Sequence, residues 1–85
     1  MTKTLYVGNL PWATTEDDLA KAFRPYVDVK SCRIIMDRET GRSRGFGFVE
    51  VDESDVQRAI DALNGSSLGG REIVVNEARP RQNKF

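Results

Sequence analysis

Hydrophobic and polar residues alternate in four short stretches of the chain, and between these stretches apolar residues twice recur every three or four positions. Alternation is typical of a strand with one buried face, whereas the second spacing is typical of a helix with one buried stripe. The four expected strands are residues 4–10, 29–36, 45–51 and 71–76. One expected helix follows the first strand and the other follows the third.

The resulting order is strand, helix, strand, strand, helix, strand. Two strand–helix–strand units of similar length predict an α+β fold, the ferredoxin-like β-α-β-β-α-β sandwich, with a four-stranded antiparallel sheet and two helices packed on one face. The other face of the sheet is then open to water, so the residues on that face are the candidates for function.

Polar residues predict where the helices begin and end. Thr15 and Asp18 form a capping pair ahead of the first apolar stripe, and Ser54 is expected to cap the second helix in the same way. Pro25 should end the first helix, because a proline there disfavours the helical conformation of Arg24.

Alternation also divides the strand residues into two sets. The aliphatic set should pack under the helices, which leaves Tyr6, Phe46 and Phe48 on the opposite, open face. If the assignment were shifted by one residue, these rings would be core residues, but most of the aliphatic residues would then be exposed together. The aliphatic set is Leu5, Val7, Cys32, Ile34, Val49, Val51, Ile73 and Val75.

Exposed aromatic rings on a rigid sheet need a binding partner. Flat rings suit stacking on unpaired bases, which contributes about 1–3 kcal/mol per base. Gly45 and Gly47 alternate with Phe46 and Phe48, and small residues on the core side should let a helix pack closely. The alternative interpretation is that Gly45 and Gly47 only weaken this strand and have no functional role.

Composition excludes several functional classes. The length of 85 residues allows one small domain, and 39% hydrophobic with 31% charged residues is typical of a soluble globular protein. No apolar run approaches a membrane span. With one cysteine and no histidine, neither a disulfide framework, the usual zinc site nor histidine-based catalysis is expected. We therefore expect no cofactor, no metal and no enzymatic activity.

The charges cancel, with 13 basic and 13 acidic residues, which by itself argues against a general polyanion binder. Their distribution changes this interpretation. The helical windows 15–24 and 52–64 carry a net charge of −4, whereas residues 33–44 and 77–85 together carry +4. The predicted binding side is therefore basic, although we expect stacking to contribute more affinity than charge.

Two segments resemble the motifs of the RNA recognition motif family. The sequence RGFGFVEV at residues 44–51 resembles its octamer, and LYVGNL at residues 5–10 resembles its hexamer. The resemblance covers about residues 3–78. It is closest to small single-domain bacterial RNA-binding proteins and to plant glycine-rich RNA-binding proteins, although no glycine-rich tail is present here.

The resemblance implies roles for individual residues. Tyr6 matches the stacking aromatic of the first strand, and Phe46 and Phe48 match the pair on the third strand, of which one inserts between sugars and one stacks on a base. Arg44 matches the cation that pairs with a backbone phosphate. Val51 departs from the usual aromatic, but its alternation places it in the core, so packing rather than binding is altered.

Further candidate contacts lie outside these central positions. Arg33, Arg38 and Arg42 could follow the phosphates, although ordinary solvated charge is an equal alternative for Arg38 and Arg42. Trp12, in a loop beside the first strand, is either a hydrophobic loop anchor or a base contact. Asn9, near the end of that strand, is a further candidate RNA contact.

Other candidates lie near the C-terminus or carry negative charge. Asn76 could read a base edge at the end of the last strand, and the basic tail, with Arg79 and Arg81, could fold over bound RNA. Glu50 and Glu72 are expected on the open face, where they would repel phosphate, although a carboxylate can also accept from an exocyclic amine.

We therefore expect residues 1–78 to form a domain that binds single-stranded RNA, followed by a short basic tail at 79–85. Single-stranded DNA is an alternative ligand, because stacking ignores the 2′-hydroxyl, and a protein-interaction module on the same fold is another alternative. The protein is expected to be a monomer without membrane attachment, in the bacterial cytoplasm or, in a eukaryotic host, the nucleus.

Overall fold

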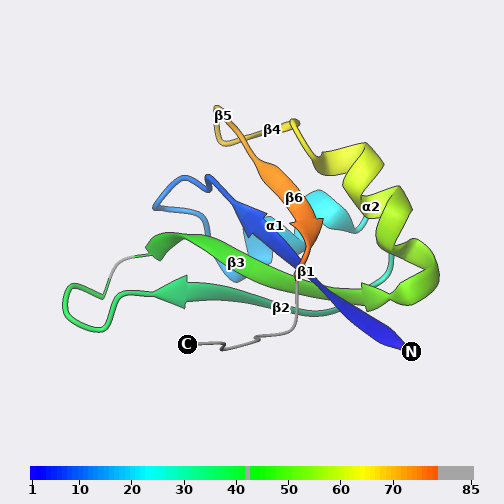
Figure 1. Cartoon of the computed structure of the whole chain (residues 1–85). Coiled ribbons are helices and arrows are strands. Elements are labelled where there is room, and N and C mark those ends of the chain that lie inside the picture. Colours follow the sequence, from blue (N-terminus) through cyan, green and yellow to red (C-terminus); the bar gives the residue numbers. More distant parts are fainter. Residues whose placement is uncertain (42, 79–85) are drawn as a thin grey trace, which may run out of the picture.

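The protein is built around one antiparallel sheet. The computed structural model describes residues 1–41 and 43–78, with the backbone alone at residues 43 and 44. The strands of the sheet lie in the order β2-β3-β1-β6 (Figure 1). They are β1 (Thr2–Gly8), β2 (Val29–Met36), β3 (Ser43–Asp52) and β6 (Val74–Glu77).

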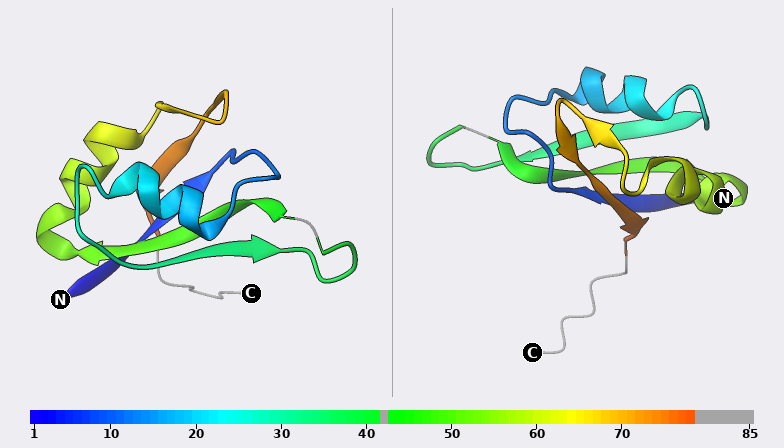
Figure 2. Two further views of the ribbon diagram at one scale, coloured as in Figure 1. Left: turned by 180° about the vertical axis from the view of Figure 1, so that it is seen from behind. Right: turned by 90° about the horizontal axis from the view of Figure 1, so that it is seen from above.

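Two eight-residue helices cover one face of this sheet. Seen from behind, the first helix lies in front of the strands and the second lies beside β6 (Figure 2), whereas the face toward the viewer in Figure 1 carries no helix. The remaining elements are α1 (Glu16–Phe23), the 3-10 turn η1 (Glu53–Asp55), α2 (Val56–Leu63), and the hairpin of β4 (Ser67–Leu68) and β5 (Arg71–Glu72). The predicted fold class is confirmed.

Three of the four strands differ from their predicted limits. The third, β3, extends beyond the predicted residues 45–51 at both ends. The first ends at Gly8 because Asn9 adopts a left-handed conformation with φ 59° and leaves the sheet. The last predicted strand is divided between β5 and β6, and the turn before β5 uses positive φ values of 59° at Gly69 and 88° at Gly70. Glycine permits this turn at little steric cost.

The capping of α1 follows the prediction. The Asp18 amide donates to Thr15 Oγ1 at 3.0 Å, and the Thr15 amide donates to Asp18 Oδ2 at 3.2 Å. The prediction for Arg24 was wrong, because this residue stays helical at φ −55° and its amide donates to Ala20 O at 2.9 Å. The helix ends because Pro25 has no amide hydrogen with which to continue it.

The second helix begins differently from the prediction. Asp52, not Ser54, is the cap: its Oδ2 accepts from the Ser54 amide at 3.0 Å at the start of η1. The hydrogen bonds from Ser54 hold the pKa of Asp52 below its usual value. Asp55, at the N-cap of α2 itself, makes no capping bond through its side chain.

The core lies between the helices and the sheet. Phe23 and Leu19 of α1 and seven of the eight predicted aliphatic residues are buried. Cys32, the eighth, is half-buried against them, and burial raises the pKa of its thiol to about 11, with the Glu16 carboxylate as the second cause. Val51 is fully buried, which confirms its place in the core.

Within the described residues, no helix is long and apolar enough to cross a membrane. The same part of the chain brings together no group of three side chains suited to holding a metal ion.

Candidate nucleic-acid interface

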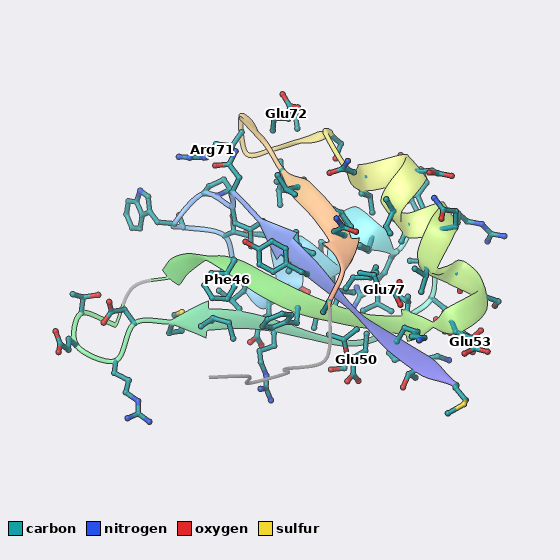
Figure 3. The ribbon with its side chains drawn as sticks, viewed as in Figure 1. Phe46, Glu50, Glu53, Arg71, Glu72 and Glu77 are labelled. Atoms are coloured by element: carbon teal, nitrogen blue, oxygen red, sulfur yellow. The ribbon has the colours of Figure 1, made fainter. Side chains whose placement is uncertain are left out.

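Tyr6, Phe46 and Phe48 form a cluster, the aromatic triad, on the face of the sheet without helices. Register places Tyr6 opposite Phe48, and Gly8 opposite Phe46, across β1 and β3. Figure 3 shows Phe46 on the side of β3 that faces the viewer. The division of the strands into a core face and an aromatic face is therefore as the alternation predicted.

The three rings pack against one another at nearly equal spacing. Their centroids are 5.8 Å apart for Tyr6–Phe46, 6.1 Å for Tyr6–Phe48 and 6.0 Å for Phe46–Phe48. Two of the pairs are edge-to-face, a favourable arrangement for aromatic rings. Mutual packing leaves each ring half-buried and held in place, so little order has to be created when a base stacks on it.

Gly8 positions the first of these rings, a role that sequence reasoning missed. A Cβ atom on Gly8 would lie 2.5 Å from the Tyr6 hydroxyl oxygen and 2.8 Å from Tyr6 Cε2. The ring of Tyr6 therefore lies over the Gly8 backbone, which is possible only without a side chain there. The signal was present in the hexamer, as a glycine two residues after the tyrosine and hence on the same face.

The glycines of β3 were predicted to let a helix pack closely, but the structure gives them a different role. The position of a Cβ on Gly47 is occupied by the backbone of β2, with Arg33 O as the nearest atom. Gly45 has φ +88°, and its carbonyl accepts a 2.9 Å hydrogen bond from the Leu10 amide. Close approach of a neighbouring strand and backbone conformation, rather than helix packing, explain these two residues.

Arg33 is the described arginine that lies beside the triad. It is exposed, faces Phe48 across β2 and β3, and has no ion-pair partner within residues 1–41 and 43–78. Arg38 is exposed in the turn after β2. The structure does not describe the side chains of the remaining predicted arginines, although it describes the backbone of Arg44. Their contacts therefore stay predictions. These arginines are Arg42, Arg44, Arg79 and Arg81.

The two predicted asparagines differ in how much of each amide is free. Asn9 Nδ2 donates to Glu72 O at 2.6 Å, and its Oδ1 accepts from Arg71 Nη2 at 2.8 Å. Asn9 thus ties the end of β1 to β5, and an RNA contact would compete with these bonds. Asn76 lies opposite Tyr6, and its Oδ1 accepts from the Glu77 amide at 2.8 Å, which leaves its NH2 group available to donate.

Trp12 lies in a different environment. Its side chain is 69% exposed and lines a hollow of about 340 Å³ with Ile34 and Met36. That hollow shares no lining residue with a second, smaller hollow beside Phe48. The high exposure argues against a buried loop anchor, and a base contact by Trp12 stays a prediction.

A hollow of about 210 Å³ adjoins the triad at Phe48. Its other lining residues are Thr4, Ser31, Arg33 and Glu50. The expectation that Glu72 shares this face was wrong: Glu72 lies on β5, outside the four-stranded sheet and far from Glu50 in Figure 3.

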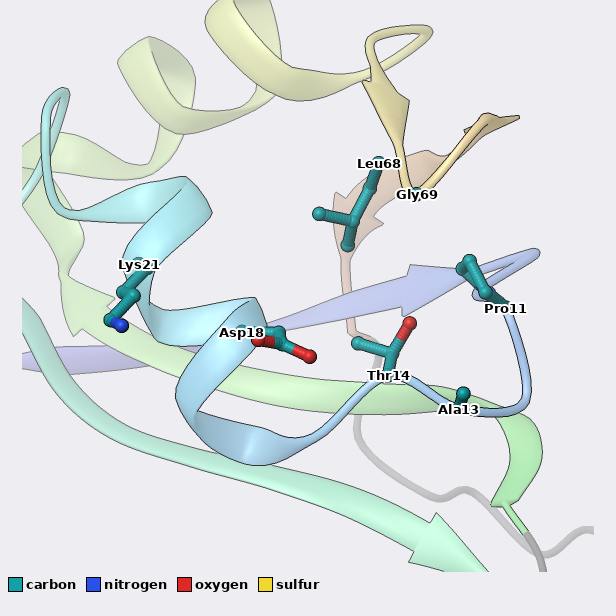
Figure 4. A pocket seen from close by; sticks show the side chains of 7 residues that line it. All are labelled: Pro11, Ala13, Thr14, Asp18, Lys21, Leu68 and Gly69. Atoms are coloured by element: carbon teal, nitrogen blue, oxygen red, sulfur yellow. The ribbon is translucent and has the colours of Figure 1, made fainter.

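A larger hollow, of about 450 Å³, lies between α1 and the β4–β5 turn (Figure 4). Its charged groups already have partners, because Asp18 belongs to the capping box and Lys21 pairs with Asp17 at 3.3 Å. It contains no predicted RNA contact. The lining residues are Pro11, Ala13, Thr14, Asp18, Lys21, Leu68 and Gly69.

Comparison of the sequence with known proteins shows which family it matches. The model of the RNA recognition motif matches residues 5–74. A glycine-rich RNA-binding protein of Daucus carota is 52% identical over 77 residues, which are 89% of this chain and 49% of that protein. The putative RNA-binding protein RbpE of Nostoc is 50% identical over 82 residues, 95% of this chain and 83% of that protein.

A solved complex has the same architecture. The SXL-lethal protein–RNA complex superposes with a TM-score of 0.88 at 37% identity, covering 98% of this chain and 50% of that one. Of the two relatives named above, the chain spans about half the length of the Daucus carota protein and most of the length of the Nostoc protein.

Proposed function

The chain belongs to the RNA recognition motif family, and from this premise we propose that it binds single-stranded RNA on the open face of its sheet. Bases stack on the aromatic triad, and arginines pair with the phosphates. The relatives are named as RNA-binding proteins and not as enzymes. Binding alone, without a chemical step, is accordingly the proposed activity.

The observation that carries this proposal is the aromatic triad itself. Three rings lie about 6 Å apart on the face opposite the helices, with Arg33 beside them. A module that binds protein on this fold would be expected to lack these aromatics or to bury them, yet all three are partly exposed. Single-stranded DNA stays the second candidate ligand, because a ring stacks on the bases of either nucleic acid.

The proposal extends to the rest of the chain. Residues 1–78 form the binding domain, and residues 79–85 are a basic tail whose arginines add phosphate contacts. The protein acts as a monomer, in the cytoplasm of a bacterial host or the nucleus of a eukaryotic one. The family match over residues 5–74 supports the extent of the domain.

The salt dependence of binding tests the contribution of the arginines. With about three phosphate contacts, the slope of log K against log salt concentration should be near −2, since each contact to a single strand contributes about −0.7. Fluorescence anisotropy with a short labelled RNA, repeated over a range of salt concentrations, measures this slope.

Two arginine variants give the matched comparison. Arg33→Gln should make the slope shallower by about 0.7. Arg58→Gln should leave it unchanged, because Arg58 lies on α2, on the other side of the sheet, and pairs with Asp55 at 3.7 Å. A slope near zero in the wild-type protein would mean that the arginines do not contact phosphate.

Substitution of Gly8 should weaken binding and spare the fold. The new Cβ in Gly8→Ala displaces the Tyr6 ring, which can swing away without moving the backbone. We expect the affinity for RNA to fall by up to the value of one stacked base, about 1–3 kcal/mol, with the urea midpoint of unfolding nearly unchanged.

A double-mutant cycle isolates this effect. In a Tyr6→Ala background, Gly8→Ala should have no further effect on affinity, because the ring that it displaces is absent. An equal loss of affinity in both backgrounds would contradict the positioning role of Gly8.

A further inference from the structure

The hollow beside Phe48 lies where three strands meet on the binding face. Register places Glu50 of β3 between Thr4 of β1 and Ser31 of β2, and places Arg33 of β2 opposite Phe48. Its volume of about 210 Å³ is below the range of roughly 300–1,000 Å³ that is usual for pockets of drug-sized ligands. The hollow is therefore of a size for a single flat base that extends past the Phe48 ring.

Glu50 presents a free acceptor at this position. Its side chain is half-buried, and within residues 1–41 and 43–78 it forms no hydrogen bond or ion pair. A carboxylate offers acceptors only, and its desolvation is costly unless donors replace the lost water. A base that covers the hollow must therefore bring N–H groups to Glu50.

The four bases differ in what they offer to a carboxylate. Guanine has two adjacent donors on its Watson–Crick edge, N1–H and the 2-amino group, which match the two carboxylate oxygens. Adenine and cytosine have one amino group beside a ring nitrogen that would repel the carboxylate. Uracil has one N–H between two carbonyl oxygens, both of which would face negative charge.

The neighbouring strand β2 supplies donors to the hollow. Arg33 and Ser31 line the same space, and Arg33 is not paired with Glu50, since no ion pair joins them. Guanine carries its O6 acceptor directly beside N1–H, so a donor from Arg33 or Ser31 completes the pattern acceptor, donor, donor. No other standard base has this sequence of groups on that edge.

We propose, on the basis of the proposed RNA-binding function, that this hollow is a guanine-selective subsite in which the Glu50 carboxylate accepts from N1–H and the 2-amino group. Glu50 is then a specificity-determining residue. Stacking on the aromatic triad supplies sequence-tolerant affinity, and the hollow adds preference for one base.

The test uses seven-nucleotide RNAs that are uridine throughout except at the centre, where the base is guanine, hypoxanthine, adenine, cytosine or uracil. We expect the guanine RNA to bind about 10-fold more tightly than the all-uridine RNA, as a bidentate base contact allows. Hypoxanthine keeps N1–H and O6 but lacks the 2-amino group, so the inosine RNA should lose most of that advantage.

Two glutamate variants locate the effect. Glu50→Gln should reduce the preference for guanine to within 2-fold, while affinity for the all-uridine RNA stays equal or rises. Glu53→Gln removes the same charge from an exposed residue of η1 and should keep the full preference. Matching amide spectra of the two variants establish that both are folded.

The outcomes separate the subsite from the general function. Equal affinity for the guanine, inosine and all-uridine RNAs, or an unchanged preference in Glu50→Gln, would overturn the subsite and leave stacking intact. Failure to bind any of the five RNAs would overturn the proposed function and this inference with it.

Discussion

Replacing both Phe46 and Phe48 with alanine lowers the affinity for single-stranded RNA by about 30-fold or more, because each ring contributes about 1–3 kcal/mol of stacking. The fold should survive, since both rings lie on the open face and pack against Tyr6 and each other rather than in the core. Anisotropy titration measures the affinity, and circular dichroism on heating measures the fold.

Tyr26 provides a matched control for this variant. It is another aromatic residue, 48% exposed, in the turn after α1 and outside the triad. Tyr26→Ala removes a similar ring and should leave RNA affinity unchanged. If the double variant bound RNA as tightly as the wild-type protein, stacking on the triad would have to be abandoned.

Replacing Phe23 should reduce the stability of the fold, whereas replacing Phe46 and Phe48 should reduce the affinity for RNA. Phe23 is the last residue of α1 and is fully buried beneath the sheet. Phe23→Ala should lower the free energy of unfolding by about 3–5 kcal/mol, a large part of the 5–15 kcal/mol that is typical of a whole domain. Urea denaturation followed by circular dichroism measures this loss.

Comparison with Phe46→Ala separates the two faces of the sheet. The open-face substitution should cost no more than the aromatic pair contacts that it removes, about 0.5–1.5 kcal/mol for each pair. Equal destabilisation by Phe23→Ala and Phe46→Ala would show that the two residues do not occupy environments as different as the structure indicates.

Alternation was sufficient to predict which residues face the core. A period of two in strands assigns every second residue to one side, and this placed Val49 and Val51 under the helices and Phe46 and Phe48 on the other face. The capping box of Thr15 and Asp18 was equally local, because its partners lie within one turn of chain.

The hairpin between α2 and β6 was not predictable in this way. Its strands, β4 and β5, have two residues each, too few for a periodic pattern. The residues that define it are glycines at positive φ and Asn9, whose amide bonds to Glu72 and Arg71 from the other end of the chain. Such long-range bonds have no local sequence signal.

The binding face was predictable in its members but not in its shape. Alternation and the motifs identified Tyr6, Phe46 and Phe48, but the spacing of the rings and the position of Tyr6 over Gly8 depend on side-chain packing that neither of them specifies. The hollow at Glu50 depends on the cross-strand register of three strands, which the order of elements does not specify. Glu72 was misplaced for the same reason.

A titration with a short single-stranded RNA, followed by NMR through the ring signals of Tyr6, Phe46 and Phe48, tests the central claim most directly. The account predicts that these signals shift on binding, whereas signals from Leu19 and Leu63, buried on α1 and α2, remain nearly unchanged. Stationary ring signals, with shifts confined to the helices, would contradict binding on the open face of the sheet.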